Sequence, residues 1–267
     1  MQETVRFLEL LNGRVAYRKL GHGPKCLLAF HGFGQDGSAL LPLVSAFPEA
    51  EYTCYFIDLP FHGQTKWEDP TFSHSDLMQV IRKLTAGRPL EGLGHSLGGR
   101  LWISLLPELK QRPKRLYLLA PDGLGSSWGG LIDYTPARIR YRAARWLKRP
   151  IRFLQLANLL RDWGVIDRFA LRYLQTQLAT EATRQRLFGT WQSLLSFKLG
   201  KNRAQQILAG ADCPVEVGLG KKDILVPARR LTAALEGMPQ VYLKLLDCGH
   251  WDMVQQWQPA KGAHNSG

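Results

Sequence analysis

The run Gly94-His95-Ser96-Leu97-Gly98-Gly99 constrains the fold of this chain more than any other stretch. It has the pattern Gly-x-Ser-x-Gly, follows a short apolar segment and precedes a helix-compatible run at residues 100–106. In a strand–turn–helix of this kind, the serine lies at the tip of the turn with unfavourable backbone angles, and small residues two positions before and after it keep strand and helix from colliding. The helix N-terminus directs free N–H groups toward the serine. The run therefore predicts a nucleophilic Ser96 between a strand and a helix.

Eight short segments of apolar and β-branched residues have the composition of β-strands. The first two are joined across Asn12-Gly13, a strong hairpin signal. From the third onward the segments alternate with helical stretches, which indicates a parallel sheet with right-handed crossovers. One such helix follows Ser73-x-x-Asp76, which resembles a capping box. We expect an α/β fold with an eight-stranded, mostly parallel sheet flanked by helices, its strands at residues 4–10, 14–20, 26–30, 52–57, 90–93, 115–119, 215–219 and 241–246.

The alternation stops between the sixth and seventh expected strands. From about residue 123 to 209 the sequence has the pattern of consecutive helices, separated by Pro150, Gly164 and Thr180. An all-helical insertion at a crossover of an α/β sheet lies over the carboxyl ends of the strands, where such sheets bind ligands. We expect a core formed by residues 1–122 and 210–258, a helical lid (cap) at 123–209 inserted between strands 6 and 7, and a flexible tail at 259–267.

Composition places the chain among ordinary globular proteins. Hydrophobic residues make up 45% and charged residues 21% of its 267 residues, and no apolar run has the length of a membrane span. The N-terminal residues do not have the pattern of a secretion signal. The four cysteines lie far apart, without the spacing of metal ligands, and we expect them to be buried, reduced thiols: Cys26, Cys54, Cys213 and Cys248. The sequence therefore predicts a cytoplasmic protein without a metal site.

A serine hydroxyl is a poor nucleophile unless a base takes its proton and a third group orients that base. His250 is the best candidate for the base, since it follows the last expected strand and so lies at the carboxyl edge of the sheet. The orienting acid should lie at the same edge, and Asp223 follows the seventh strand. Asp122, after the sixth strand, is the alternative acid. The order Ser96, Asp223, His250 is the one found in serine hydrolases built on open α/β sheets.

The tetrahedral intermediate of acyl transfer needs two donors for its oxyanion. The backbone N–H of Leu97, at the start of the helix after Ser96, is the first expected donor. We expect the second to be the N–H of Phe33, because His31-Gly32-Phe33-Gly34 follows the third strand and its small residues allow the backbone to approach. For His31 and His95 we expect a structural role rather than the role of a base.

Taken together, these segments resemble the α/β-hydrolase fold superfamily, in its lid-bearing, esterase-like branch. The resemblance covers residues 26–251, and the matching stretches are 31–34, 58–63, 94–99, 220–227 and 249–250. It implies a serine hydrolase that cleaves a carboxylic ester or related acyl bond through an acyl-enzyme intermediate, without a cofactor. Dehalogenases and epoxide hydrolases of this fold carry aspartate at the position of Ser96, so their reactions are not expected here.

The chain departs from this superfamily at two places. Its relatives usually have Pro-Gly-His-Gly where this chain has Pro60-Phe61-His62-Gly63. The strand before the serine, at residues 90–93, is shorter and less β-branched than usual. Neither departure removes a catalytic group, but both can alter the local packing.

The formal net charge of +13 is concentrated in the expected lid. Fifteen of the 35 Lys and Arg residues, but only four of the 22 Asp and Glu residues, lie between Ser126 and Arg203. Residues 135–149 form an amphipathic pattern with one basic side, which fits a solvated face, an anionic membrane surface, or a pocket for a substrate carboxylate or phosphate. Nucleic-acid binding is not expected, since a basic stripe without a recognised module is not sufficient.

Two alternatives to an esterase stay open. The run from Ser96 to Arg100 is similar to that of a lidded pyruvate-eliminating lyase of the same superfamily, which suggests a lyase or carbon–carbon bond hydrolase acting on an acidic small molecule. A ligand receptor on this fold is the other alternative, because function depends on the site and not on the fold. Arg100, Trp128 and Trp191 are the tentative substrate-binding residues, and the chain is expected to be a monomer or a homodimer.

Overall fold

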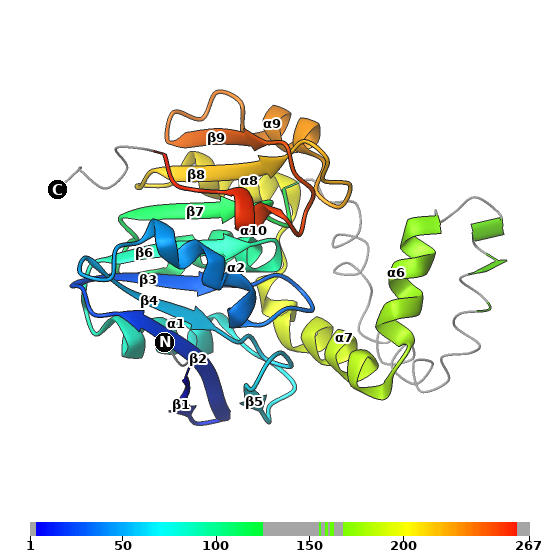
Figure 1. Cartoon of the computed structure of the whole chain (residues 1–267), viewed down its shortest axis with the longest axis horizontal. Helices are drawn as coiled ribbons and strands as arrows, with labels where there is room; N and C mark the ends of the chain where they lie inside the picture. Colours follow the sequence, from blue (N-terminus) through cyan, green and yellow to red (C-terminus); the bar gives the residue numbers. More distant parts are fainter. Residues whose placement is uncertain (1–3, 125–154, 156–157, 160, 163–167, 261–267) are drawn as a thin grey trace.

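A nine-stranded mixed sheet forms the centre of the computed structural model (Figure 1). The structure describes residues 4–124, 155, 158–159, 161–162 and 168–260. The eight expected strands are all present, and a two-residue strand, β5, pairs with β2 in addition. The strands are β1 (Val5–Leu10), β2 (Gly13–Gly21), β3 (Lys25–Phe30), β4 (Tyr52–Ile57), β5 (Lys66–Trp67), β6 (Leu90–His95), β7 (Arg115–Leu119), β8 (Val215–Gly220) and β9 (Val241–Leu246).

The strand order is β1-β2-β4-β3-β6-β7-β8-β9. The six strands from β4 to β9 along this path are parallel, whereas β2 is antiparallel to both β1 and β4. From β3 the chain passes first to β4 on one side and later to β6 on the other side. The strand order therefore reverses between β3 and β6, and ligands of open α/β sheets bind outside the carboxyl ends of the strands at such a point.

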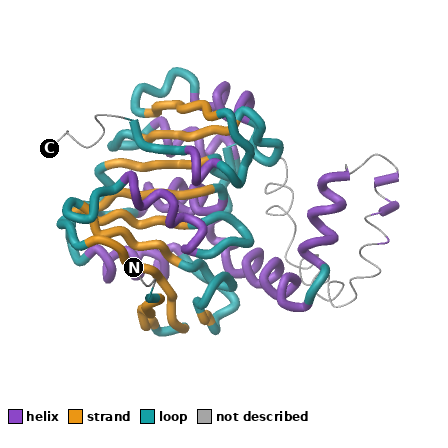
Figure 2. Tube along the Cα trace, in the orientation of Figure 1, coloured by secondary structure: helices purple, strands orange, loops and turns teal. Residues whose placement is uncertain are grey.

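Helices cover both faces of the sheet (Figure 2). The 3-10 helix η1 (Gly37–Ala46) and α10 (Met253–Gln256) lie on the face nearest the viewer in Figure 1, and α1 (His74–Thr85), α2 (Leu97–Leu105) and α8 (Lys201–Ala209) lie behind it. The remaining described helices are η2 (Leu106–Glu108), α6 (Arg168–Leu178), α7 (Glu181–Ser193), η3 (Leu194–Phe197) and α9 (Ala228–Leu235). This two-sided arrangement buries the strands β3, β4, β6 and β8 almost completely.

Local signals in the sequence explain two of these elements. Helix α1 begins with the expected capping box, in which Ser73 and Asp76 each accept a hydrogen bond from the other's backbone N–H. The β1–β2 hairpin is also present, but its two-residue loop is Leu11-Asn12 rather than Asn12-Gly13. Gly13 pairs with Leu10 and lies against β5, where an added Cβ would come within 2.3 Å of the Lys66 carbonyl oxygen. The glycine is therefore needed for this close approach of two strands.

The segment between β7 and β8 contains helices, as the sequence predicted, and α6 and α7 lie beyond the carboxyl ends of the strands (Figure 1). Thr180 caps α7 through a reciprocal hydrogen-bonded pair with Thr183. Within the described residues, α8 packs against α2 at the back of the sheet. The basic stretch at 135–149, Trp128 and the tail at 261–267 lie outside the described residues, so the domain boundaries and the lid remain predictions.

The chain after the last strand is held to the sheet by a buried carboxylate. Glu216 on β8 accepts a hydrogen bond of 3.1 Å from the indole N–H of Trp257 and another of 3.1 Å from the Ala260 N–H. The Trp257 ring contacts Tyr117 edge to face. His250 lies in the loop between β9 and Trp257. The interactions of Trp257 with Glu216 and Tyr117 therefore fix one end of the loop that carries the expected base.

All four cysteines are buried free thiols, as predicted. Among the helices that the structure describes, none combines the length and the hydropathy needed to cross a bilayer.

Candidate active site

Ser96 lies at the tip of a strained turn between β6 and α2. Its backbone has φ 50° and ψ −111°, which is unfavourable for a residue with a side chain, and the turn is held by hydrogen bonds from Ser96 N–H to Leu119 O and from Asp122 N–H to Ser96 O. Ser96 is partly exposed. Strand β6 extends to His95 and is two residues longer than the expected strand, so it carries the serine directly to the carboxyl edge of the sheet.

The glycines of this turn are required by close backbone contacts. A Cβ at Gly94 would come within 2.5 Å of the Gly98 backbone, and a Cβ at Gly98 would come within 2.0 Å of the Phe30 carbonyl oxygen. Because Gly94 has no side chain, β6 and the first turn of α2 can lie close together. The missing side chain at Gly98 lets α2 approach β3. The pattern Gly-x-Ser-x-Gly therefore has the packing reason that the sequence predicted for it.

Asp223 and His250 form a buried pair at the same edge. His250 Nδ1 lies 2.7 Å from Asp223 Oδ2, and the two side chains are 5% and 0% exposed. The other carboxylate oxygen, Oδ1, accepts the N–H groups of Leu225 and Val226 at 2.9 and 2.8 Å. These two bonds fix the orientation of the Asp223 carboxylate. The carboxylate accepts a hydrogen bond from His250 Nδ1, so the imidazole carries its proton on Nδ1 and its Nε2 can accept another proton.

The alternative acid, Asp122, lies in a different environment. Its carboxylate forms an ion pair of 3.5 Å with Arg100 and accepts the N–H of Gly123 at 2.8 Å. The structure therefore places Asp223 on the His250 imidazole, and Asp122 beside Arg100 at the first turns of α2.

The loop that carries Phe33 is fixed by two histidines. His31 Nδ1 donates to Gly32 O at 2.7 Å and its Nε2 accepts the Leu59 N–H at 3.0 Å. His62 Nδ1 donates to Pro60 O at 2.9 Å and its Nε2 accepts the Gly34 N–H at 3.1 Å. Each ring therefore joins the loop after β3 to the loop after β4, and each must be neutral, because its Nε2 accepts a hydrogen bond.

Asp58 also connects the segments that follow β3 and β4. It accepts hydrogen bonds from Arg18 at 2.9 Å, from the Gly37 N–H at 2.8 Å and from the Gln64 N–H at 2.8 Å. Asp58 and His62 are included in the sequence analysis only as members of the matching stretch 58–63, with no role assigned to either of them, and Arg18 and Gln64 are not singled out there. The signal that was available is the conjunction of His31, Asp58 and His62 at the carboxyl ends of two adjacent strands.

His95 connects the Phe33 loop with the His250 loop. Its Nε2 lies 3.1 Å from the carbonyl oxygen of His250, and its Nδ1 lies 3.1 Å from Gln35 Oε1, which also accepts the Gly32 N–H at 3.0 Å. A Cβ at Gly32 would lie 3.0 Å from His95 Nδ1 and 3.3 Å from Ser96 Cβ. The three loops therefore meet around Ser96, and the structural role expected for His31 and His95 agrees with these contacts.

Burial lowers the pKa of all three structural histidines. Desolvation is the largest cause in each case, and it lowers the pKa of His31 to about 4 and those of His62 and His95 to about 3. The neighbouring His31 adds to the effect at His62, and His250 adds to it at His95.

These shifts predict an acid-sensitive fold. Below pH 6.5 the unfolded chain binds protons at these histidines while the folded chain does not, so the free energy of unfolding should fall by several kcal/mol between pH 7.5 and 5. Urea unfolding at a series of pH values measures this slope. His62→Gln, whose amide can still accept from Gly34, should flatten it, whereas His22→Gln at an exposed histidine should not. An equal dependence of the unfolding free energy on pH in all three proteins would contradict the conclusion that His62 is buried and neutral in the folded chain.

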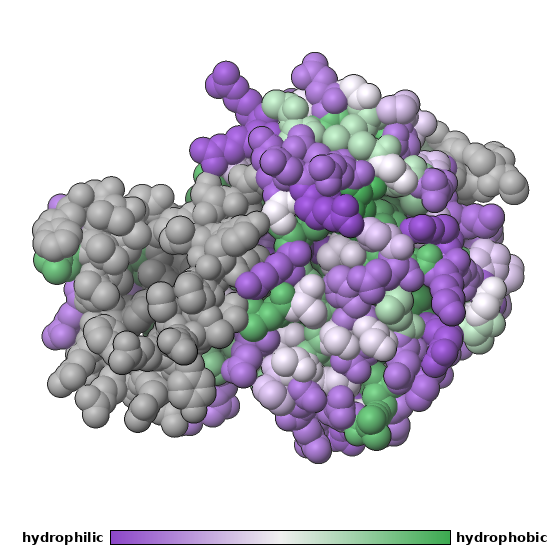
Figure 3. Space-filling view, turned by 180° about the vertical axis from the view of Figure 1, so that it is seen from behind, coloured by the Kyte–Doolittle hydropathy of each residue, from purple (hydrophilic) through white to green (hydrophobic). Residues whose placement is uncertain are grey.

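Of the three tentative substrate-binding residues, the structure describes two. Arg100, on α2, pairs with Asp122 after β7, and Trp191 lies on α7 with its ring edge-on to Phe188 at 6.2 Å. Trp128 lies outside the described residues. Figure 3 shows one face of the molecule, on which hydrophilic residues dominate the coloured surface and hydrophobic residues lie scattered among them. That face has the character of an ordinary solvent-exposed surface.

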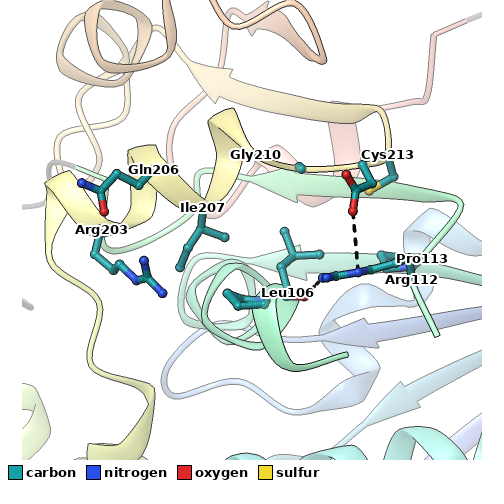
Figure 4. A pocket seen from close by; sticks show the side chains of 11 residues that line it. Leu106, Arg112, Pro113, Arg203, Gln206, Ile207, Gly210 and Cys213 are labelled. Carbon is teal, nitrogen blue, oxygen red and sulfur yellow. Dashed lines mark hydrogen bonds and ion pairs between the residues drawn. The ribbon is translucent and has the colours of Figure 1, made fainter. Parts of the chain in front are cut away.

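A cavity of about 280 Å³ lies away from Ser96 (Figure 4). Its walls include Pro113, which precedes β7, and Cys213, which precedes β8, so it lies at the amino ends of the strands. Arg112 crosses it and contacts Leu106 O and Asp212. Because the catalytic candidates lie at the carboxyl ends, this cavity is not their substrate site. Among the described residues, no group of three or more His, Cys, Asp or Glu side chains has an arrangement that could hold a metal ion.

The chain belongs to the alpha/beta hydrolase family, whose sequence pattern matches residues 27–260. It is 26% identical over 258 residues to the dihydrolipoyllysine-residue acetyltransferase component of the acetoin cleaving system of Cupriavidus necator, covering 94% of this chain and 65% of that protein. It is also 25% identical over 266 residues to an uncharacterized protein of Mycobacterium tuberculosis, with 93% and 76% covered. The chain thus spans less than two thirds of the length of the acetyltransferase component.

Solved structures show the same fold. A thermophilic esterase from Thermogutta terrifontis superposes with a TM-score of 0.64 at 17% identity, covering 96% of this chain and 94% of that one. A hydrolase from Pseudomonas aeruginosa superposes with a TM-score of 0.63 at 20% identity, with 96% and 95% covered. At these identities the similarity establishes the α/β-hydrolase fold.

Proposed function

We propose that this protein is a serine hydrolase that cleaves a carboxylic ester or a related acyl bond through an acyl-enzyme intermediate. The observation that carries the proposal is the buried pair of His250 Nδ1 and Asp223 Oδ2 at 2.7 Å, at the same sheet edge as the strained Ser96. Membership of the alpha/beta hydrolase family supports a hydrolase. The esterase and hydrolase among the solved structures share only its fold.

In this proposal Ser96 Oγ attacks the acyl carbon while His250 Nε2 takes its proton. Asp223 holds the imidazole in the tautomer with a proton on Nδ1 and stabilises the imidazolium that forms. The backbone N–H groups of Leu97 and Phe33 donate to the oxyanion. His250 then protonates the leaving alcohol, and a water molecule activated by the same imidazole releases the acid from Ser96.

The positions of the two donors are consistent with this role. Leu97 is the first residue of α2, so its N–H is one of the groups that the helix itself leaves unpaired. Phe33 belongs to the loop whose next residue, Gly34, is bound by His62, and the Phe33 ring lies edge-on to His62 at 5.7 Å. A fixed loop provides a donor that needs no rearrangement during the reaction.

The test is covalent labelling together with turnover. We expect p-nitrophenyl esters of different acyl lengths to give a burst of p-nitrophenol stoichiometric with the enzyme, and a fluorophosphonate to label the peptide that contains Ser96. The preferred acyl length reports the size of the pocket. Labelling without turnover would favour the receptor alternative, and the absence of both would contradict the proposed nucleophile.

The lyase or carbon–carbon hydrolase alternative uses the same triad mainly for proton transfer. It would be favoured over the esterase if acidic substrates react without formation of an acyl-enzyme on Ser96. Mass spectrometry of the enzyme during turnover separates the two, because only the esterase accumulates or passes through a serine ester.

A further inference from the structure

Helices α6 and α7 carry buried polar atoms that have no hydrogen-bond partner. Four such side-chain atoms lie between residues 177 and 191 within the described part of the chain: Gln177 Oε1, Arg186 Nε, Thr190 Oγ1 and Trp191 Nε1. Gln177 and Thr190 are 8% and 4% exposed. Unpartnered buried polar atoms are destabilising and rare in native structures, so a group of them in one short stretch suggests partners that a ligand supplies.

Arg186 and Thr190 lie on the side of α7 that faces the core. They are four residues apart and hence neighbours on one side of the helix, with Gly189 beside them. A Cβ at Gly189 would come within 2.3 Å of the Phe61 ring, so this side of α7 packs directly against the loop after β4. Phe61 has φ 63°, a strained value for a residue with a large side chain, and its ring fills the space left by the glycine.

The loop that α7 contacts is part of the candidate active site. Phe61 is followed by His62, whose ring accepts the Gly34 N–H at 3.1 Å and lies edge-on to Phe33. After burial and His31, the positive charge of Arg186 is a further cause that lowers the pKa of His62, which agrees with a guanidinium close to that ring. Arg186 and Thr190 therefore lie beside the loops that border Ser96.

The chemistry of this side of α7 selects one class of ligand. Arg186 presents N–H donors with a positive charge, and Thr190, on the same side of the helix, adds a hydroxyl without an acceptor. A planar guanidinium binds carboxylates and phosphates through two parallel hydrogen bonds, and a carboxylate is the one that an acyl compound can carry as a second acid group. It would satisfy the buried Nε–H and neutralise the charge in the same contact.

We propose that Arg186, together with the Thr190 hydroxyl, binds a carboxylate of the substrate, so that the preferred substrates are acyl compounds that bear a second, free carboxylate. This inference rests on the proposed hydrolase function and names its substrate class. The departure from Pro-Gly-His-Gly at Phe61 has a role in this arrangement, because the Phe61 ring packed on Gly189 sets the position of α7 and hence of Arg186.

The test compares matched pairs of esters. Each pair consists of a mono-p-nitrophenyl ester of a linear dicarboxylic acid and the p-nitrophenyl ester of a neutral acid with the same number of carbons. We expect the wild type to prefer the acidic member, mainly through a lower KM. Arg186→Gln should reduce the ratio of kcat/KM between acidic and neutral esters by about 10- to 100-fold, as expected for a lost hydrogen-bonded charge contact. Thr190→Val should reduce the ratio less.

Two controls keep the result specific. Arg203→Gln removes the same charge from an exposed position on α8 and should leave the ratio unchanged, which excludes a general effect of net charge. Arg186→Lys keeps the charge but loses the planar fork, and it should retain part of the preference. Wild-type turnover that depends on Ser96 but shows no preference for acidic esters would overturn this inference and leave the hydrolase function intact.

Binding separates the two proposals if no ester is hydrolysed. Calorimetry with monomethyl glutarate and wild-type protein then measures the carboxylate site without chemistry. Binding that is lost in Arg186→Gln and kept in Arg203→Gln would support the site even though the hydrolase proposal had failed. Absence of binding in the wild type would overturn it.

Discussion

Replacing Ser96 with alanine should lower kcat for ester hydrolysis by about 10⁵- to 10⁶-fold, the size of effect seen when a triad nucleophile is removed. In the proposed mechanism the reason is local, because the strained turn at φ 50° holds this hydroxyl at its tip and the residues on either side of it, His95 and Leu97, carry no hydroxyl or thiol. His250→Ala should cost about as much, and the double variant little more, since the two groups act as one unit.

A matched control for Ser96→Ala is Ser104→Ala on the same helix. Ser104 is buried and its hydroxyl donates to Leu101 O at 2.9 Å within α2, so its loss affects stability but not the chemistry. Urea unfolding of both variants shows whether the fold is intact. Retention of more than about one hundredth of the wild-type kcat in Ser96→Ala would mean that another residue is the nucleophile.

Asp223→Asn should lower kcat by about 10⁴-fold. The asparagine oxygen can still accept the N–H groups of Leu225 and Val226, so the loop should keep its shape. Its amide nitrogen would then face His250 Nδ1 and hold the imidazole in the tautomer with the proton on Nε2, which cannot accept the proton of Ser96.

Asp122→Asn is the comparison that separates the two candidate acids. It weakens the ion pair with Arg100 at 3.5 Å and should lower kcat by less than about tenfold, because it leaves the Asp223–His250 pair in place. Steady-state kinetics of both variants on the same ester gives the answer. If Asp122→Asn were as damaging as Asp223→Asn, the acid would have been assigned to the wrong strand.

Several structural features follow from sequence because their causes are local. The Gly-x-Ser-x-Gly run predicts its own turn, since the positive φ at Ser96 and the contacts of Gly94 and Gly98 are requirements of the strand–turn–helix itself. The sequence predicts two further features for the same reason. They are the capping box at Ser73 and the alternation of strands and helices that gives the parallel sheet. The hairpin was predicted but its loop was placed one residue late, because Gly13 serves the contact with β5, a strand that no local pattern indicates.

Tertiary structure alone decided the partners of the site residues. The sequence favoured Asp223 over Asp122 as the acid without excluding Asp122, since both follow strands, and only the folded chain brings Asp223 to 2.7 Å from His250 and Asp122 to Arg100. The links from His62 to Gly34, from His95 to the His250 carbonyl and from Gly189 to Phe61 span 28, 155 and over a hundred residues. Such contacts depend on the order of strands in the sheet and on side-chain packing, which no spacing along the chain records. The sequence therefore determined which chemical groups reach the carboxyl edge, and the packing of loops around that edge determined which of them meet.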